Sequence, residues 1–281
     1  MKKLPFVILF CWFSNLYALE FTLCINKDTT TISALPVSGC SFNSTPDFNF
    51  RNESISLDLN DTLKLHVINN DTLPHTFTID GILTQDNEIP PLSSDSFSVS
   101  FSTSGSYRYY SDKPYGKMIG ASGIISVGYS NFIQYFWNLY DLENELSNNL
   151  AAEIQSEIPF DYNPELFFIN GLSFPSTVDD SATMIHANVG DEIIVSIVNS
   201  GNMDHVLHFH GFHVEVLEAK ISSKYTGWIK DTFPVKCQEA MTVKLVPHQV
   251  GIYPVHDHNL IAVTEIGFYP GGMLTLLNIE Q

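Results

Sequence analysis

Two short segments of the chain carry most of its histidines. Six of the ten histidines lie in residues 205–213 and 256–258, and four of them form the pairs His208-Phe-His210 and His256-Asp-His258. Both pairs fall in segments with strand texture, where side chains two residues apart point to the same face. If the two strands are neighbours, four imidazoles converge, and imidazole binds copper, zinc, nickel and iron. The spacing predicts a metal site, with a metal-free hydrogen-bonded cluster as the alternative.

The remaining histidines are expected to have separate roles. His205 and His213 are out of phase with the two pairs, so each is predicted to pack or hydrogen-bond on its own. Four others stand apart from the pairs and are expected to be structural: His66, His75, His186 and His248.

The elements that must position the pairs are predominantly β. From about residue 47 to 127, short runs alternate polar and apolar residues, as in Leu63-Lys64-Leu65-His66-Val67, and turn residues punctuate them. The same texture resumes from about residue 165 to the end. This pattern predicts an all-β chain made of antiparallel sandwiches.

Between the two β regions, residues 131–157 contain no Gly or Pro, and large apolar residues recur there at three- and four-residue steps. That periodicity predicts an amphipathic helix covering a sheet.

The two β regions resemble repeats of each other. The run LKLHVIN at 63–69 matches IIVSIVN at 193–199, and GSYRYYSD at 105–112 matches GIYPVHDH at 251–258. The chain is therefore expected to carry one β fold twice, with the histidine pairs only in the second copy.

The first residues and the charge set the expected location. Lys2 and Lys3 precede an apolar run and a small residue at Ala18, the layout of a cleavable secretory signal peptide. The net charge of −18 disfavours nucleic acid and anionic membrane surfaces as partners. We therefore expect an exported protein, periplasmic or extracellular, with no membrane association after cleavage. Export would allow a disulfide between Cys24 and Cys40.

Four segments of the second half resemble a known family. Residues 205–217 (HVLHFHGFHVEVL) resemble the His-x-x-His-x-His-Gly segment in the last domain of multicopper oxidases, which are laccase-like proteins. Residues 251–258 (GIYPVHDH) resemble that family's closing His-Cys-His segment, and residues 231–235 and 267–273 fit its intervening and strand-end patterns. The tail from 257 to 274 is also similar to the second domain of copper nitrite reductases. The likeness is specific over about 190–277 and rests on fold pattern alone in the first half.

The resemblance implies two cupredoxin-like Greek-key β-sandwich domains, copper, and electron transfer to dioxygen. It assigns the copper ligands to His208, His210, His256 and His258. The chain departs from the family at the blue-copper centre, where Asp257 replaces the Cys, Ala262 the second His and Gly267 the axial Met, while His205 is retained. A carboxylate does not replace the soft thiolate of such a centre. No blue-copper centre is expected, and nothing in the spacing brings Cys237 to His205.

The first copy also departs from the family's eight-histidine trinuclear cluster. The places that match its four histidines are taken by oxygen-bearing side chains: Thr78, Asp80, Tyr110 and Asp112. Whether Tyr110 or Asp112 supplies an oxygen ligand stays open. What remains is room for one or two copper ions.

The predicted organisation is a signal peptide (1–18), a first cupredoxin-like domain without a metal cluster (19–128), a helical linker (129–160) and a multicopper-oxidase-like domain (161–281). Three functions follow. The chain is an exported copper oxidoreductase acting on a small molecule or metal ion with dioxygen, a copper carrier or store, or a structural module with vestigial histidines. A homo-oligomer is compatible with each.

Overall fold

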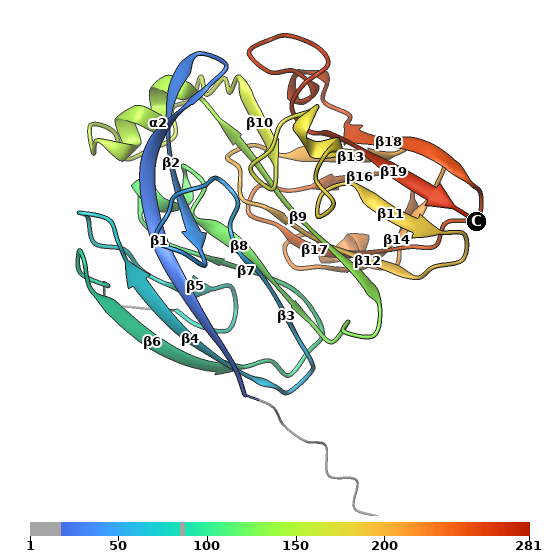
Figure 1. Ribbon diagram of the computed structural model, residues 1–281, viewed down its shortest axis with the longest axis horizontal. Helices are drawn as coiled ribbons and strands as arrows, with labels where there is room; N and C mark the ends of the chain where they lie inside the picture. Colours follow the sequence, from blue (N-terminus) through green and yellow to red (C-terminus); the bar gives the residue numbers. More distant parts are fainter. Residues whose placement is uncertain (1–17, 85–87) are drawn as a thin grey trace, which may run out of the picture.

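Two β-sandwiches lie side by side in the computed structural model, which describes residues 18–84 and 88–281. In Figure 1 the first sandwich runs from blue to green and the second from yellow to red, with the green strand β9 between them. The predicted signal peptide falls almost wholly on residues 1–17, outside the described residues. The prediction of two β-sandwich domains is confirmed.

The first sandwich has two four-stranded sheets. One has the order β2-β1-β4-β6, with bounds β1 Ala18–Ile32, β2 Leu35–Asn43, β4 Thr62–Asn69 and β6 Ser94–Ser100. The other has the order β3-β8-β7-β5, with bounds β3 Ser54–Leu57, β5 Thr78–Ile79, β7 Gly105–Tyr110 and β8 Ser122–Val127. Strand β4 shows why this region folds so: Leu63, Leu65 and Val67 are buried while the residues between them are more exposed.

The second sandwich has a six-stranded and a five-stranded sheet. The first of these has the order β10-β9-β12-β17-β14-β15, with bounds β9 Ile133–Leu142, β10 Leu166–Ile169, β12 Ile193–Asn199, β14 Val214–Ala219, β15 Ile229–Lys230 and β17 Ala240–Leu245. The second has the order β11-β19-β18-β13-β16, with bounds β11 Ile185–Asn188, β13 His205–Phe209, β16 Thr232–Val235, β18 Gly251–Asp257 and β19 Leu274–Glu280.

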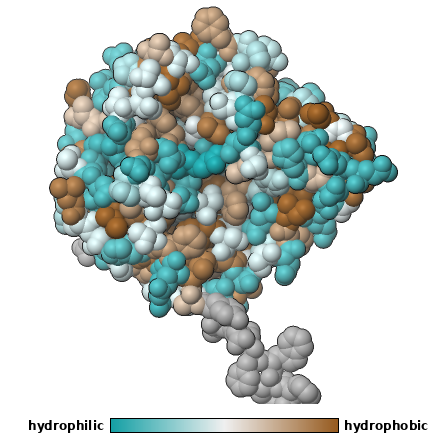
Figure 2. Space-filling view, viewed as in Figure 1, coloured by the Kyte–Doolittle hydropathy of each residue, from teal (hydrophilic) through white to brown (hydrophobic). Residues whose placement is uncertain are grey.

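Helices are short. The α-helices are α1 Pro114–Lys117 and α2 Asn144–Ala151, and the 3-10 turns are η1 Ser176–Val178, η2 Ser223–Tyr225 and η3 Leu260–Val263. Helix α2 covers the first sandwich: Leu146 and Leu150 join its core, and Asn148 accepts a hydrogen bond from the backbone N–H of Ser38 in β2 at 3.0 Å. Among the described residues, no helix has the length and apolarity to cross a bilayer. Figure 2 shows hydrophilic and hydrophobic residues intermixed on the face drawn.

The prediction of one helix over 131–157, and of a helical linker over 129–160, was wrong in its first half. Residues 133–142 form strand β9, parallel to β12. Trp137 and Leu139 enter the core of the second sandwich, whereas Tyr140 and Leu142 enter the core of the first. A strand buried on both faces reads as a continuous apolar run, and here the run also satisfied a helical spacing.

This strand moves the domain boundary. Because β9 is an inner strand of the six-stranded sheet, the second sandwich begins near residue 133, not at 161. The two sandwiches also share a packed interface, in which Ile124 of β8 contacts Val198 and Ala240 of β12 and β17. The hydroxyls of Ser106 and Thr242 hydrogen-bond across it at 2.8 Å.

The suggested disulfide is not present. Cys24 and Cys40 are both free and buried. The antiparallel register of β1 and β2 pairs Cys24 with Asn43 and Cys40 with Lys27, so the two cysteines are not opposite each other.

Candidate metal centre

The two histidine pairs lie at the ends of neighbouring strands: His208 and His256 belong to β13 and β18, and the second histidine of each pair directly follows its strand. Strands β13 and β18 pair antiparallel, and their register places His208 directly opposite His256. The His208 ring lies 4.5 Å from that of His210, 5.5 Å from that of His256 and 5.6 Å from that of His258, measured between centroids. The convergence of four imidazoles predicted from the spacing is therefore found.

Core packing fixes which way the pairs face. Leu207, Phe209 and Val255 alternate with the histidines and are fully buried. Phe209 stacks between Trp137 and Phe233, with centroid distances of 5.6 and 5.9 Å. Because neighbouring strand residues point to opposite faces, this anchoring turns the histidines outward. His210 and His258 are exposed, and the other two are half-buried.

Hydrogen bonds leave ring nitrogens of the cluster facing each other. The Nδ1–H of His256 donates to its neighbour's carbonyl, that of Asp257, at 2.8 Å, which leaves Nε2 of the neutral ring as a lone-pair donor to metals. That Nε2 lies 3.0 Å from Nε2 of His210. The Nδ1 of His208 is 2.7 Å from the hydroxyl of Thr232.

The donor set fits a transition metal, although three ligands are not yet assembled around one point. Two nitrogens bound tetrahedrally to one ion at ~2.0 Å lie roughly 3.3 Å apart, close to the distance between His210 and His256. Over residues 18–84 and 88–281, no group of three or more His, Cys, Asp or Glu side chains is arranged to hold a metal ion. A third imidazole would join by side-chain rotation, which the exposure of His210 and His258 permits. Burial and the neighbouring rings of His208 and His256 lower the pKa of His210, which favours the neutral, ligating form.

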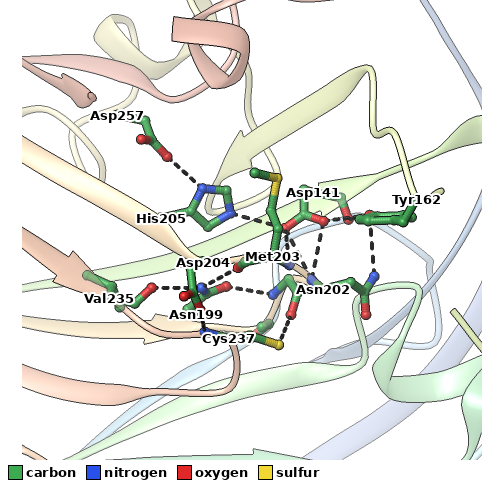
Figure 3. Close-up of polar contacts among 12 residues, drawn as sticks. Asp141, Tyr162, Asn199, Asn202, Met203, Asp204, His205, Val235, Cys237 and Asp257 are labelled. Atoms are coloured by element: carbon green, nitrogen blue, oxygen red, sulfur yellow. Dashed lines mark hydrogen bonds and ion pairs between the residues drawn. The ribbon is translucent and has the colours of Figure 1, made fainter. Parts of the chain in front are cut away.

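The opposite face of the same strands holds a buried ion pair network. His205, which begins β13, lies between two carboxylates, as Figure 3 shows: its Nδ1 is 2.6 Å from Asp257 and its Nε2 is 3.0 Å from Asp141. All three side chains are fully buried. We refer to Asp141, His205 and Asp257 as the buried triad.

The charges of the buried triad decide the protonation of His205. Burial alone would lower its pKa, but hydrogen bonds and charges from Asp141 and Asp257 outweigh it and raise the pKa to about 9. At neutral pH His205 is therefore an imidazolium, and both of its ring nitrogens carry protons that the carboxylates accept. No nitrogen of His205 is free for a metal.

Asp141 is itself anchored from several sides. It accepts hydrogen bonds from the Tyr162 hydroxyl and from the backbone N–H of Asn202. Burial, together with the charge of Asp141, raises the pKa of Tyr162 above its ordinary value, so the phenol stays protonated. Asp141 was missed by sequence reasoning because it lay inside the predicted helix. Its parity with Trp137 and Leu139 on a strand is the signal that would have found it.

Cys237 lies near the buried triad without joining it. Its thiol donates to the carbonyl of Gly201 at 3.1 Å, and burial raises its pKa to about 11. It is a protonated thiol at neutral pH and not the thiolate that copper would select.

The first sandwich has a counterpart of the buried triad with a different charge balance. His75, aligned with His205, lies 3.0 Å from Asp71 and 2.9 Å from the hydroxyl of Ser111, which is aligned with Asp257. Lys27 also pairs with Asp71 at 2.9 Å. Burial lowers the pKa of His75 despite the adjacent Asp71, so this histidine is neutral. One carboxylate shared with a lysine leaves a neutral ring, whereas two carboxylates make the ring a cation.

Three of the four oxygen-bearing residues of the first sandwich have cations as partners. Asp80 accepts from Arg108 at 2.9 Å, and the guanidinium lies over the Tyr110 ring at 4.0 Å. Asp112 pairs with Lys117. Thr78 pairs with Tyr110 across β5 and β7. These groups stabilise one another within the first sandwich.

The other predicted structural histidines are dispersed. His66 hydrogen-bonds Ser96, and His248 packs edge-on against Phe212. His186 and His213 are exposed.

A family model and solved structures match the chain. The model described as multicopper oxidase matches residues 149–269, which include both histidine pairs. No curated protein matches. This match relates residues 149–269 to the multicopper oxidases.

Solved structures agree on the fold. A blue copper oxidase from Nitrosomonas europaea matches with a TM-score of 0.76 and 21% identity, over 93% of this chain and 86% of that one. The multicopper oxidase mgLAC matches with a TM-score of 0.76 and 20% identity, over the same shares. A copper nitrite reductase from Nitrosomonas europaea matches with a TM-score of 0.70 and 15% identity, over 93% of this chain and 94% of that one. The cupredoxin-like fold predicted for both domains is thus confirmed.

Proposed function

We propose that this chain is an exported copper-binding protein related to multicopper oxidases, which binds one or two copper ions through four histidines: His208, His210, His256 and His258. The observation that carries the proposal is the register of β13 and β18, which puts His208 opposite His256 and gathers all four rings on one face. The family relation of residues 149–269 supports copper over other metals that imidazole binds.

We also propose that the chain has no blue-copper centre. Asp257 stands where the resemblance places the thiolate, and the one retained ligand, His205, has both nitrogens bound to carboxylates. Electrons would therefore reach the bound metal directly from a substrate at the exposed face.

Bound copper would supply one-electron redox chemistry and a place for dioxygen. The residues of the chain orient its ligands: the carbonyl of Asp257 fixes the ring of His256, and Thr232 holds that of His208. Two activities suit this arrangement, oxidation of a small molecule or metal ion with dioxygen, and copper transport or storage. The exposure of His210 and His258 favours the carrier, because an open site allows ligand exchange with a donor or acceptor protein.

The metal proposal is tested by titrating the purified protein with Cu(II) and Cu(I) against a competing chelator. His208→Ala, at the centre of the cluster, should weaken copper binding at least tenfold. His213→Ala is the matched control, because it removes an exposed imidazole near the cluster but outside it. Equal affinities for the two variants would reject the four-histidine site. Electron paramagnetic resonance of the Cu(II) form should show nitrogen couplings. An intense blue absorption from a copper–thiolate bond would show that a blue-copper centre is present and would contradict the second proposal.

Turnover separates the two activities. Dioxygen consumption with phenols, Cu(I) or Fe(II) is expected for an oxidase and not for a carrier. Export is tested separately, by sequencing the N-terminus of the mature protein, which should begin after Ala18.

A further inference from the structure

Asp257 stands between two histidines of the cluster, and its side chain points to the other face of the strand. Its carboxylate accepts three hydrogen bonds: from Nδ1 of His205 at 2.6 Å, from the backbone N–H of Val206 at 3.2 Å and from that of Asn259 at 2.8 Å. The first two donors belong to β13 and the third to the turn after His258. One buried carboxylate therefore joins the segments that carry the two histidine pairs.

The contacts of Asp257 reach residues next to the histidines of both pairs. In the β13–β18 pairing Asp257 is opposite Leu207, one residue before His208. The backbone N–H of His258 also donates to the carbonyl of Val206 at 2.6 Å. Because His258 lies beyond the end of β18, the bonds of Asp257 to Val206 and Asn259 hold that end of the cluster in place.

Asp141 holds the other nitrogen of the same imidazolium, but from a strand that carries no histidine. It lies on β9, and its carboxylate contacts Tyr162, His205 and the backbone N–H groups of Asn202 and Met203, which precede β13. The molecule thus contains two buried carboxylates on one cation, of which only Asp257 is bonded to the backbone of the ligand-bearing segments.

The first sandwich supports a link between this carboxylate and the cluster. At the place that matches Asp257 it has Ser111, so a hydroxyl contacts His75 there in place of a carboxylate. That copy lacks the histidine pairs. The carboxylate at this strand position is thus found in the copy that carries the histidine pairs.

We propose that Asp257 is a positioning residue for the four-histidine cluster, holding the pair on β13 and the pair around β18 in a fixed relative position through its bonds to His205, Val206 and Asn259. The inference rests on the proposed copper function, which it deepens. It separates Asp257 from Asp141, whose role is to stabilise the buried imidazolium.

The experiment compares two isosteric variants, Asp257→Asn and Asp141→Asn. Each removes one carboxylate charge from the same buried imidazolium, so both should lower stability to urea by similar amounts. Asp257→Asn should also weaken Cu(II) binding about tenfold or more and change the nitrogen couplings of the Cu(II) spectrum. Asp141→Asn should keep the wild-type spectrum and an affinity within about threefold of wild type. Matching affinities and spectra in the two variants would overturn the positioning role.

A metal-free readout keeps this inference separate from the proposed function. Ring 15N and 13C shifts of His256 and His258 in the apo protein should change in Asp257→Asn and not in Asp141→Asn. If wild-type protein binds no copper, the proposed function fails, while these shifts still decide whether Asp257 positions the rings. Unchanged shifts in both variants would reject the positioning role even where copper binds.

A second pair of variants tests the same link should Asp257→Asn fail to fold. In His205→Asn the amide replaces Nδ1 and keeps a donor toward Asp257, whereas in His205→Gln the amide replaces Nε2 and keeps a donor toward Asp141. The positioning role predicts that His205→Gln binds copper more weakly than His205→Asn. It also predicts that the ring shifts of His256 and His258 change more in His205→Gln. The reverse order would overturn it.

Discussion

The protonated His205 makes a prediction about stability and pH. Its pKa rises from the ordinary 6.5 to about 9 in the folded chain, because Asp141 and Asp257 outweigh the effect of burial. Between these values the folded chain holds one proton more than the unfolded chain. The free energy of unfolding must therefore fall as the pH rises through this window.

The magnitude follows from the two pKa values. At ~1.4 kcal/mol for each unit, the buried triad contributes about 3 kcal/mol through this proton. The contribution is fully present below pH 6.5 and is lost as the pH rises through about 9. Three neighbouring groups do not titrate in the window: the pKa of Cys237 is about 11, that of Tyr162 is raised by burial and Asp141, and the ion pair with Lys236 holds that of Asp204 below its ordinary value.

The assay is urea denaturation of wild type and His205→Gln at about pH 6, 7.5 and 9. The stability difference between the two proteins should shrink by about 3 kcal/mol from the lowest to the highest pH, since Gln carries no titrating proton. His213→Ala, which removes an exposed histidine, should track wild type throughout. A constant difference between wild type and His205→Gln would refute the protonated triad.

Three further outcomes are expected. Gly201→Ala should destabilise the fold by about 1–3 kcal/mol in urea denaturation, because its Cβ would lie 2.0 Å from the fixed carboxylate of Asp141. Phe209→Ala should cost about 3–5 kcal/mol, measured in the same way, since it empties the fully buried stack under the histidines. Burial raises the pKa of Asp71, but His75 and Lys27 outweigh burial and lower it to about 2, so Lys27→Met should raise this pKa, as an NMR titration of the carboxyl carbon would detect.

The histidine cluster could be predicted from the sequence because its geometry is local. Two His-x-His pairs need only strand periodicity and one neighbour relation. That relation was a condition of the prediction, and the register of β13 and β18 meets it. The same reasoning placed His205 apart from the pairs, and the structure gives it separate hydrogen-bond partners.

The buried triad could not be predicted in full, because it depends on contacts between distant segments. Asp141 is 64 residues from His205 in sequence. Its strand is buried by two different cores, so neither an alternating nor a one-sided pattern marked it. The register of β1 and β2, which separates Cys24 from Cys40, depends likewise on pairing that residue types alone do not specify.

Strand β9 has a practical consequence for dividing the protein. A fragment beginning at residue 161 would keep every histidine of the cluster yet lose the strand between β10 and β12, exposing apolar edges and leaving His205 with a single carboxylate. A fragment beginning near residue 131 would keep the sheet whole, but Tyr140 and Leu142 would then face water in place of the first core. Although the two halves share one architecture, neither is expected to be stable as an isolated fragment.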